Sequence, residues 1–207
     1  MNAAQTLYFA RPFQIEIRSE PLPPLAPHQL TVQTVVSAIS AGTELLFYRG
    51  QVPPEMSVDA TIDGMGDSVQ YPLRYGYCSA GAVVAVGEEV DPAWLGRRVF
   101  AFQPHASAFV SEPAALLPIP DSLSYEQAVL LPNMETAVNF VMDARPLVGE
   151  RVLVLGLGVV GLLTSYLLRQ FPLAKLAAID AYAKRRGLAT TLGVDKTFSP
   201  DQVENLQ

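Results

Sequence analysis

The stretch that decides the fold is VLVLGLGVVGLL, residues 152–163, where three glycines spaced G-x-G-x-x-G follow an aliphatic run. In a turn from a buried strand into a helix, each of these glycines has its own role. Gly156 permits the tight turn, Gly158 lets the backbone approach a phosphate, and Gly161 lets the helix pack closely on the strand. The first turn of such a helix offers free N–H groups and a partial positive charge. The motif therefore predicts a site for the pyrophosphate of a dinucleotide.

The surroundings of the glycine turn agree with this prediction. RVLVLG before the turn has the pattern of a buried strand, and Val159 and Val160 open the helix that follows it. Asp180 ends the next expected strand, where a carboxylate accepts hydrogen bonds from the ribose hydroxyls of NAD. Two alternatives stay open: small residues that merely pack another α/β protein, and Arg185 with Arg186 binding a 2′-phosphate, which Asp180 would repel. We expect NAD as the cofactor, and NADP less.

The rest of the chain divides into a β-rich part and an α/β part. Alternating or β-branched runs at 30–40, 80–87, 97–102 and 107–112 indicate strands. From Arg151 the order is strand, glycine turn, helix, strand, helix, with a third short strand after it. We therefore expect an α/β protein with a β-rich domain at 1–145 and an incomplete parallel dinucleotide-binding sheet at 146–207.

Composition excludes several classes of partner. Half of the residues are hydrophobic and 16% are charged, with a net charge of −6, so a packed core is expected and a nucleic-acid partner is not. A single cysteine, Cys78, fits a reducing compartment. The N-terminus lacks the pattern of a signal peptide, and the apolar run 152–168, 17 residues, is shorter than the about 20 that span a bilayer. We expect a cytoplasmic protein that is not inserted in a membrane.

The order of a β-rich domain and a dinucleotide fold resembles the medium-chain dehydrogenase/reductase superfamily of alcohol and threonine dehydrogenases, whose N-terminal domain is GroES-like. Within the superfamily, the segments AGTELLFYRG (41–50) and RYGYCSAG (74–81) are most similar to the branch of bacteriochlorophyllide-type dehydrogenases. The resemblance extends over the whole chain and rests on the segments 40–50, 72–90, 96–102 and 134–140 together with the glycine turn. It implies hydride transfer between NAD(H) and a small alcohol or carbonyl substrate.

The zinc-ligand positions of that superfamily are changed in this sequence. Zinc members place a cysteine before a Gly-Thr-Asp-like turn, where this chain has Ala41, and they continue with Gly-His-Glu, where it has Gly-Tyr-Cys at 76–78. A catalytic zinc needs about three protein ligands, and the whole chain has one cysteine and two histidines. We expect no metal. A replacement site of Glu44, Cys78 and His105 is the less favoured alternative.

Four further residues are candidates by the resemblance. Thr43 and Tyr77 are candidate hydrogen-bond donors to the substrate oxygen, Glu44 is a candidate base, and Thr136 resembles the threonine near the nicotinamide. Each also has a structural interpretation. Thr43 could cap a turn, Glu44 could hold a salt bridge, Tyr77 could pack in a core, and Thr136 could be a hydroxyl at a helix start.

The dinucleotide part is about half as long as in that superfamily, so we expect its C-terminal strands to be missing. An incomplete parallel sheet exposes an apolar edge and face. A longer polypeptide, a truncated product and a partner or second copy that covers the sheet are all consistent with this length. Two classes of function therefore remain open: an oxidoreductase, and a binding module that holds a nucleotide or a partner without turnover.

Overall fold

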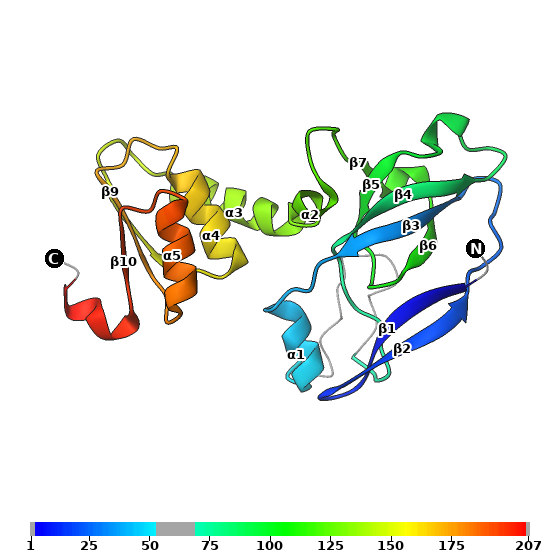
Figure 1. Ribbon diagram of the computed structural model, residues 1–207, viewed down its shortest axis with the longest axis horizontal. Helices are drawn as coiled ribbons and strands as arrows, with labels where there is room; N and C mark the ends of the chain where they lie inside the picture. Colours follow the sequence, from blue (N-terminus) through cyan, green and yellow to red (C-terminus); the bar gives the residue numbers. More distant parts are fainter. Residues whose placement is uncertain (1–2, 53–68, 206–207) are drawn as a thin grey trace. The chain divides into compact units, whose positions relative to one another are not determined.

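The computed structural model describes residues 3–52 and 69–205, which form two compact units, 1–130 and 131–207. Figure 1 shows the elements of each unit. The sequence predicts the boundary at 145/146, after a helical stretch that Pro132 interrupts and that ends before the turn PLVGE. Pro132 instead lies in the first turn of one helix, Leu131–Ala144, where proline is tolerated. That helix packs within the second unit, so the units meet at 130/131.

The first unit is built from antiparallel strands. Five strands form a sheet in the order β6-β3-β4-β5-β7, and β1 pairs with β2 in a hairpin. The elements are β1 (Ala3–Arg11), β2 (Gln14–Pro21), β3 (Leu30–Ser37), α1 (Thr43–Arg49), β4 (Ser79–Val86), η1 (Pro92–Trp94), β5 (Arg98–Ala101), β6 (Ala108–Ser111), η2 (Pro113–Ala115), β7 (Leu117–Pro118) and α2 (Tyr125–Ala128).

Alternation along the strands explains the core of this sheet. Leu30 and Val32 of β3 are fully buried and pack against Val83 of β4 and Val99 of β5. Ahead of α2 the S-x-x-Q pattern forms a capping box, since Ser124 and Gln127 each accept a backbone N–H of the other.

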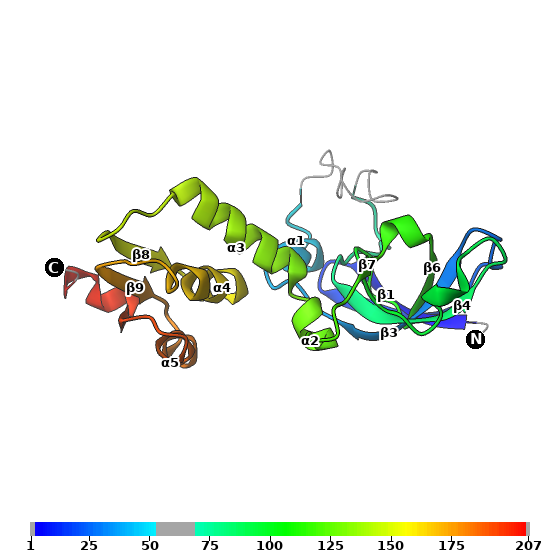
Figure 2. The ribbon, with the colours of Figure 1, turned by 90° about the horizontal axis from the view of Figure 1, so that it is seen from above.

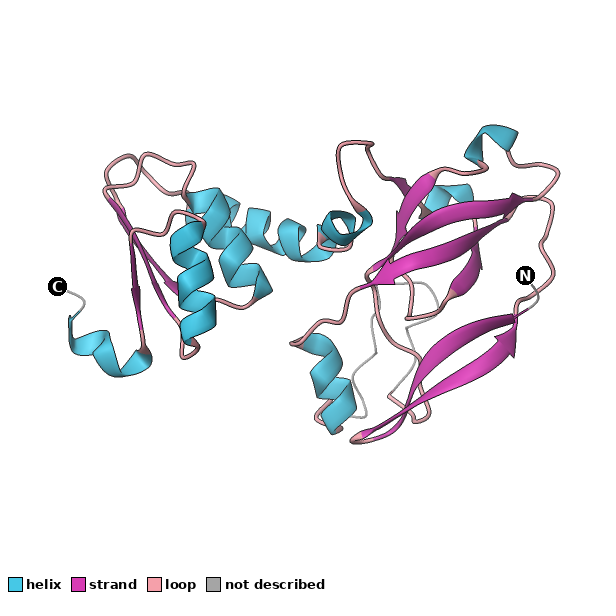
Figure 3. Ribbon diagram, in the orientation of Figure 1, coloured by secondary structure: helices cyan, strands magenta, loops and turns pink. Residues whose placement is uncertain are grey.

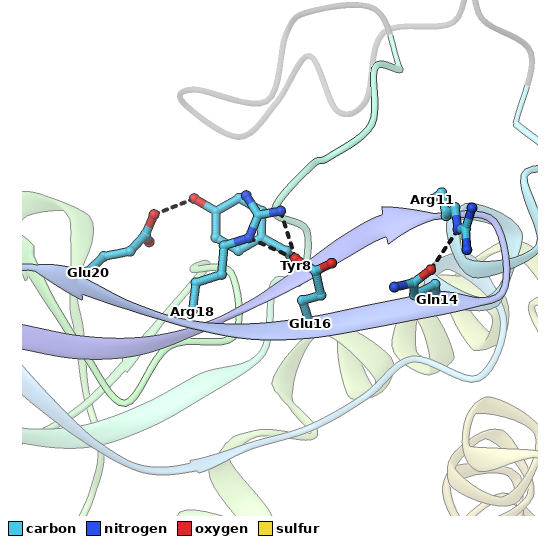
Figure 4. A network of polar contacts seen from close by, with 6 residues as sticks. All are labelled: Tyr8, Arg11, Gln14, Glu16, Arg18 and Glu20. Carbon is cyan, nitrogen blue, oxygen red and sulfur yellow. Dashed lines mark hydrogen bonds and ion pairs between the residues drawn. The ribbon is translucent and has the colours of Figure 1, made fainter.

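The hairpin carries a network of polar side chains (Figure 4). The Tyr8 hydroxyl donates to Glu20 at 2.6 Å, and Arg18 donates to Glu16 at 2.8 Å while its guanidinium lies 4.4 Å from the centre of the Tyr8 ring. These groups are partly exposed, so each pair contributes about 1 kcal/mol or less to stability. The buried side of the hairpin is held by Phe9, which packs with Leu73.

The second unit is a parallel sheet with helices, which Figure 3 separates by colour. The strand order is β10-β9-β8, and α4 packs on β8 and on α5. The elements are α3 (Leu131–Ala144), β8 (Arg151–Leu155), α4 (Val159–Leu168), β9 (Lys175–Ile179), α5 (Ala183–Thr191), β10 (Lys196–Phe198) and η3 (Pro200–Asn205). The predicted fold class, antiparallel β followed by a parallel α/β part, is confirmed.

One side of this sheet is open. β8 is the last strand in the sheet order of the described residues, and Leu153 and Leu155 are 42% and 74% exposed. A cavity of about 480 Å³ lies between β8 and the helices α3 and α4, which Figure 2 shows beside it. Among residues 3–52 and 69–205, no helix is long and apolar enough to cross a bilayer.

Candidate functional site

The glycine turn has the geometry that its sequence predicts. Gly156 adopts φ +91°, which side-chain-bearing residues rarely adopt. A Cβ on Gly161 would lie 1.9 Å from the carbonyl oxygen of Gly156, so only glycine allows α4 to approach the strand this closely. A Cβ on Gly156 or Gly158 would meet nothing within 4 Å, so the space beside the turn is open. Gly158 is the N-cap of α4 and provides no side-chain cap, which leaves N–H groups of the first turn to bind an anion.

Asp180 fastens this turn to the neighbouring strand. It directly follows β9 and is 7% exposed. Its Oδ2 accepts the N–H of Leu157 at 2.7 Å, and its Oδ1 accepts the N–H of Tyr182 at 2.7 Å. Burial by itself raises the pKa of Asp180, but these two N–H donors and the charge of Arg185 together hold the pKa below its ordinary value. Asp180 is therefore an ionised acid at the carboxyl end of β9, beside the open turn.

Two arginines lie next to Asp180 and are used differently. Arg186 donates from Nη1 to the carbonyl oxygens of Asp180 and Ala181, at 2.7 and 3.0 Å. Arg185 places Nη1 3.6 Å from Asp180 Oδ2, and its guanidinium stacks 4.7 Å from the centre of the Tyr182 ring. Arg186 therefore binds the backbone carbonyls of residues 180 and 181, whereas Arg185 forms an ion pair with the carboxylate of Asp180.

These features fit the adenosine and pyrophosphate of a dinucleotide: an open turn, free helix N–H groups and an ionised acid beside them. Val159 is the first residue of α4 and is 48% exposed. Val160 lines the cavity beside β8. Thr136 is the sixth residue of α3, and its hydroxyl donates to the carbonyl oxygen of Pro132, four residues earlier in the same helix, at 3.0 Å.

The second set of candidates lies in the first unit, around the buried pair of Glu44 and His105. Glu44 is 1% exposed, and its Oε2 is 2.7 Å from Nε2 of His105, which is 7% exposed. Glu44 Oε1 also accepts the N–H of Ser40 at 2.9 Å, and the Ser37 hydroxyl bonds to Nδ1 of His105. This Ser37–His105–Glu44 network links β3, α1 and the segment before β6. Thr43, the first residue of α1, is exposed.

The segment 76–78 packs on this network. A Cβ on Gly76 would lie 2.9 Å from the His105 ring, so the missing side chain makes room for the imidazole. Tyr77 is half-buried and makes an edge contact with Tyr75. Cys78 is 2% exposed, and burial together with the Glu44 charge raises the pKa of its thiol to about 12. Within the described part of the chain, no three His, Cys, Asp or Glu side chains are grouped to hold a metal ion.

The structure brings the predicted residues together in two groups, one in each unit. Gly156, Gly158, Gly161 and Asp180 gather at one end of the parallel sheet. Glu44 and the Gly76–Cys78 segment gather at His105 in the first unit. The sequence offers His105 only as a ligand in the less favoured metal alternative. The sequence indicates its role only weakly: His105 is one of two histidines in the chain, and it stands in an apolar stretch beside an expected strand.

Comparisons with known proteins agree with this architecture. No family model matches the chain. "Probable D-xylulose reductase A" of Neosartorya fischeri is 25% identical over 223 residues, covering 92% of this chain and 59% of that protein. Sorbitol dehydrogenase 1 of Saccharomyces cerevisiae is 24% identical over 222 residues, covering 91% and 58%. A crystal structure described as a short-chain alcohol dehydrogenase from E. coli CFT073, complexed with NADH, has a TM-score of 0.77, 20% identity and coverage of 98% and 64%.

The antiparallel β unit, the glycine turn and the parallel strands of this chain have the fold of that structure. The resemblance to the medium-chain dehydrogenase/reductase superfamily is confirmed, since the relatives of this chain are xylulose and sorbitol reductases of that superfamily. The chain spans 59% of the length of the first of these relatives. The bacteriochlorophyllide-type branch stays a prediction.

Proposed function

We propose that this chain is part of an NAD(H)-dependent oxidoreductase that transfers hydride between the cofactor and an alcohol or carbonyl substrate without zinc. The observation that carries the proposal is Asp180, an ionised acid that bonds to the N–H of Leu157 inside an open glycine turn. That arrangement presents anion-binding N–H groups and a ribose-binding carboxylate side by side.

Each candidate residue has a role in this proposal. Bound NAD supplies the hydride acceptor or donor. Gly156, Gly158 and Gly161, with Val159 and Val160 at the start of α4, form the pyrophosphate cradle. Asp180 binds the adenosine ribose, and Thr136 is the candidate beside the nicotinamide.

The substrate oxygen needs donors in the absence of a metal. Ala41 and Tyr77 occupy two positions that hold zinc ligands in the superfamily, and neither a methyl group nor a half-buried phenol is an ordinary zinc ligand. Thr43 and Tyr77 are the proposed donors to that oxygen. Glu44 acts through His105, whose ring it orients at 2.7 Å. The cytoplasm is the proposed compartment, as the single cysteine indicates.

The first test is a thermal-shift titration of the chain with NADH. A ligand that binds only the folded state, at about 100 times its Kd, adds about 2.7 kcal/mol to the free energy of unfolding. Asp180→Asn should remove this response. Asp195→Asn is the matched control, because Asp195 also accepts a backbone N–H, from Leu176 at 2.7 Å, but on another segment. Equal responses of the two variants to NADH would show that Asp180 does not take part in binding the cofactor.

Turnover is tested in the full-length protein by the appearance of NADH with a panel of secondary alcohols and polyols. A zinc analysis of the purified active protein accompanies it. Activity that requires stoichiometric zinc would contradict the zinc-free part of the proposal. Absence of NAD(H)-dependent turnover with every alcohol and carbonyl of the panel would contradict the enzymatic part.

A second candidate function is supported by the open face of β8. Leu155 is 74% exposed there, which suits a module that binds a nucleotide and a partner or second copy without turnover. This alternative predicts stabilisation by nucleotide, no hydride transfer, and a concentration-dependent oligomer in light scattering. A protein that stays monomeric at all concentrations would contradict the oligomer.

A further inference from the structure

We propose that β2, the outer strand of the hairpin, is a docking surface for a second copy of this chain, whose own β2 pairs with it antiparallel. The hairpin belongs to the first unit, whereas the glycine turn belongs to the second. This inference therefore goes beyond the proposed function and does not depend on it.

The first step concerns the backbone of β2. Within residues 3–52 and 69–205, β2 pairs with β1 and with no other strand, so its outer edge carries unpaired N–H and C=O groups. Proteins usually protect such an edge with lysine, proline or a bulge. The strand Gln14–Pro21 has no lysine, and its one proline is the last residue. The edge is therefore open to another strand.

The second step concerns the side chains of β2, which alternate in the unusual sense. Ile15 and Ile17 point outward and are 52% and 68% exposed. Glu16, Arg18 and Glu20 lie on the other face, where they are half-buried and form the polar network of Figure 4. A strand with one face in water normally turns its polar side chains outward. The exposed apolar stripe therefore indicates that a partner covers this face.

The third step identifies the partner from the charges along the strand. When two β2 strands pair antiparallel about a two-fold axis at Ile17, Glu16 of each copy lies opposite Arg18 of the other. Opposite charges across a strand pair stabilise it. Ile17 then lies opposite Ile17 of the second copy and diagonal to its Ile15, so four isoleucines form one apolar stripe. The strand is thus complementary to itself.

Other registers do not have this complementarity. A two-fold axis at residue 16 places the two Glu16 side chains opposite each other, and an axis at residue 18 does the same for the two Arg18 side chains. Like charges in such positions are destabilising. An axis between two residues places Ile17 opposite a charged residue. The register centred on Ile17 overlaps residues 14–20 and uses the open edge of both copies, so association stops at a dimer.

The first test is the mass of the chain in solution, measured by sedimentation velocity from about 1 to 100 µM, where a small interface dissociates. We expect a monomer–dimer equilibrium. Ile17→Lys should weaken the dimer at least about tenfold, because it places two ammonium groups opposite each other at the centre. A chain that is monomeric throughout, or an Ile17→Lys variant that dimerises as the native chain does, overturns the inference.

Two control variants locate the interface. Ile39→Lys makes the same substitution at an isoleucine of the first unit that is 69% exposed and lies outside the strands, and it should leave the dimer unchanged. Leu155→Lys alters the open face of β8, where the second candidate function places its contact. A dimer that Leu155→Lys abolishes and Ile17→Lys leaves intact assigns the association to β8 and overturns this inference.

The register is tested by mixing two variants. Glu16→Arg and Arg18→Glu each place like charges opposite each other in their own dimers, and each should lose at least about tenfold in dimer affinity. An equimolar mixture restores two opposite-charge pairs and should dimerise within about threefold of the native chain. Thermal unfolding of each variant checks that it is folded. A mixture that associates no better than its two components overturns the pairing of β2 with β2.

Discussion

The glycine turn and the Ser37–His105–Glu44 network are opposite ways of building a polar site. The turn and Asp180 come from one contiguous segment, Val152 to Asp180, and its key contact is a backbone N–H on a carboxylate. The network joins residues as far apart as Glu44 and His105, and both of its ionisable groups are buried. The glycine turn places Asp180 beside open space, so this site is suited to bind a ligand. In the network, Glu44 and His105 bond to each other, so the network is suited to hold side chains in position.

The largest expected effect comes from breaking the network. His105→Ala leaves the Glu44 carboxylate buried without its partner, which should cost about 3–5 kcal/mol of unfolding free energy. Urea denaturation of the chain measures this cost. His28→Ala is the control, since His28 pairs with Glu112 at 3.5 Å with both side chains more than half exposed, and should cost about 1 kcal/mol or less. Similar costs for the two variants would show that burial does not strengthen the contact between His105 and Glu44.

An intermediate effect comes from filling the turn. Gly161→Ala puts a methyl group 1.9 Å from the backbone oxygen of Gly156, which cannot move without shifting α4, and should cost about 1–3 kcal/mol. Gly158→Ala meets nothing within 4 Å and should change stability by less than about 1 kcal/mol while weakening NADH binding. Comparing the two variants therefore separates the effect of a glycine on helix packing from its effect on the approach of a ligand to the backbone. Equal destabilisation by the two substitutions would contradict the division of roles between the glycines.

The smallest expected effect is an acid dependence of the turn. The folded-state pKa of Asp180 lies below its ordinary value of 3.8, so the ionised form stabilises the fold. This contribution is complete above the unfolded-state pKa and is lost as the pH falls through the folded-state pKa. Stability measured against pH from neutral to below pH 3.8 should therefore decline more steeply for the native chain than for Asp180→Asn. Parallel curves would show that Asp180 ionises alike in both states.

The sequence predicted the turn better than it predicted the network. The strand, glycines, helix and acid follow one another, so the order along the chain already gives their arrangement, and φ +91° at Gly156 agrees with it. The sequence offers Glu44 both as a base and as the partner of a structural salt bridge. Its partner in the structure, His105, is distant in sequence and belongs to no motif. Gly76 gives no sign in the sequence that it makes room for that ring.

The domain boundary shows a different limit. The boundary predicted at 145/146 follows the helix α3, whereas the compact units divide before it, at 130/131. Whether α3 belongs with the β-rich part or with the parallel sheet depends on its packing against α4, which is a tertiary contact. The roles of Thr43, Tyr77 and Thr136 stay predictions.

The open face of β8 also predicts how the protein behaves at high concentration. Leu153 and Leu155 stand beside a strand edge that pairs with no other strand in the described residues. Two molecules that meet along this edge can extend each other's sheets, and the rate of such encounters rises with the square of the concentration. Dilution, low temperature near the stability maximum, or a single charge introduced at Leu155 should each lengthen the useful lifetime of a sample. Added kosmotropic salt strengthens apolar association and should shorten it.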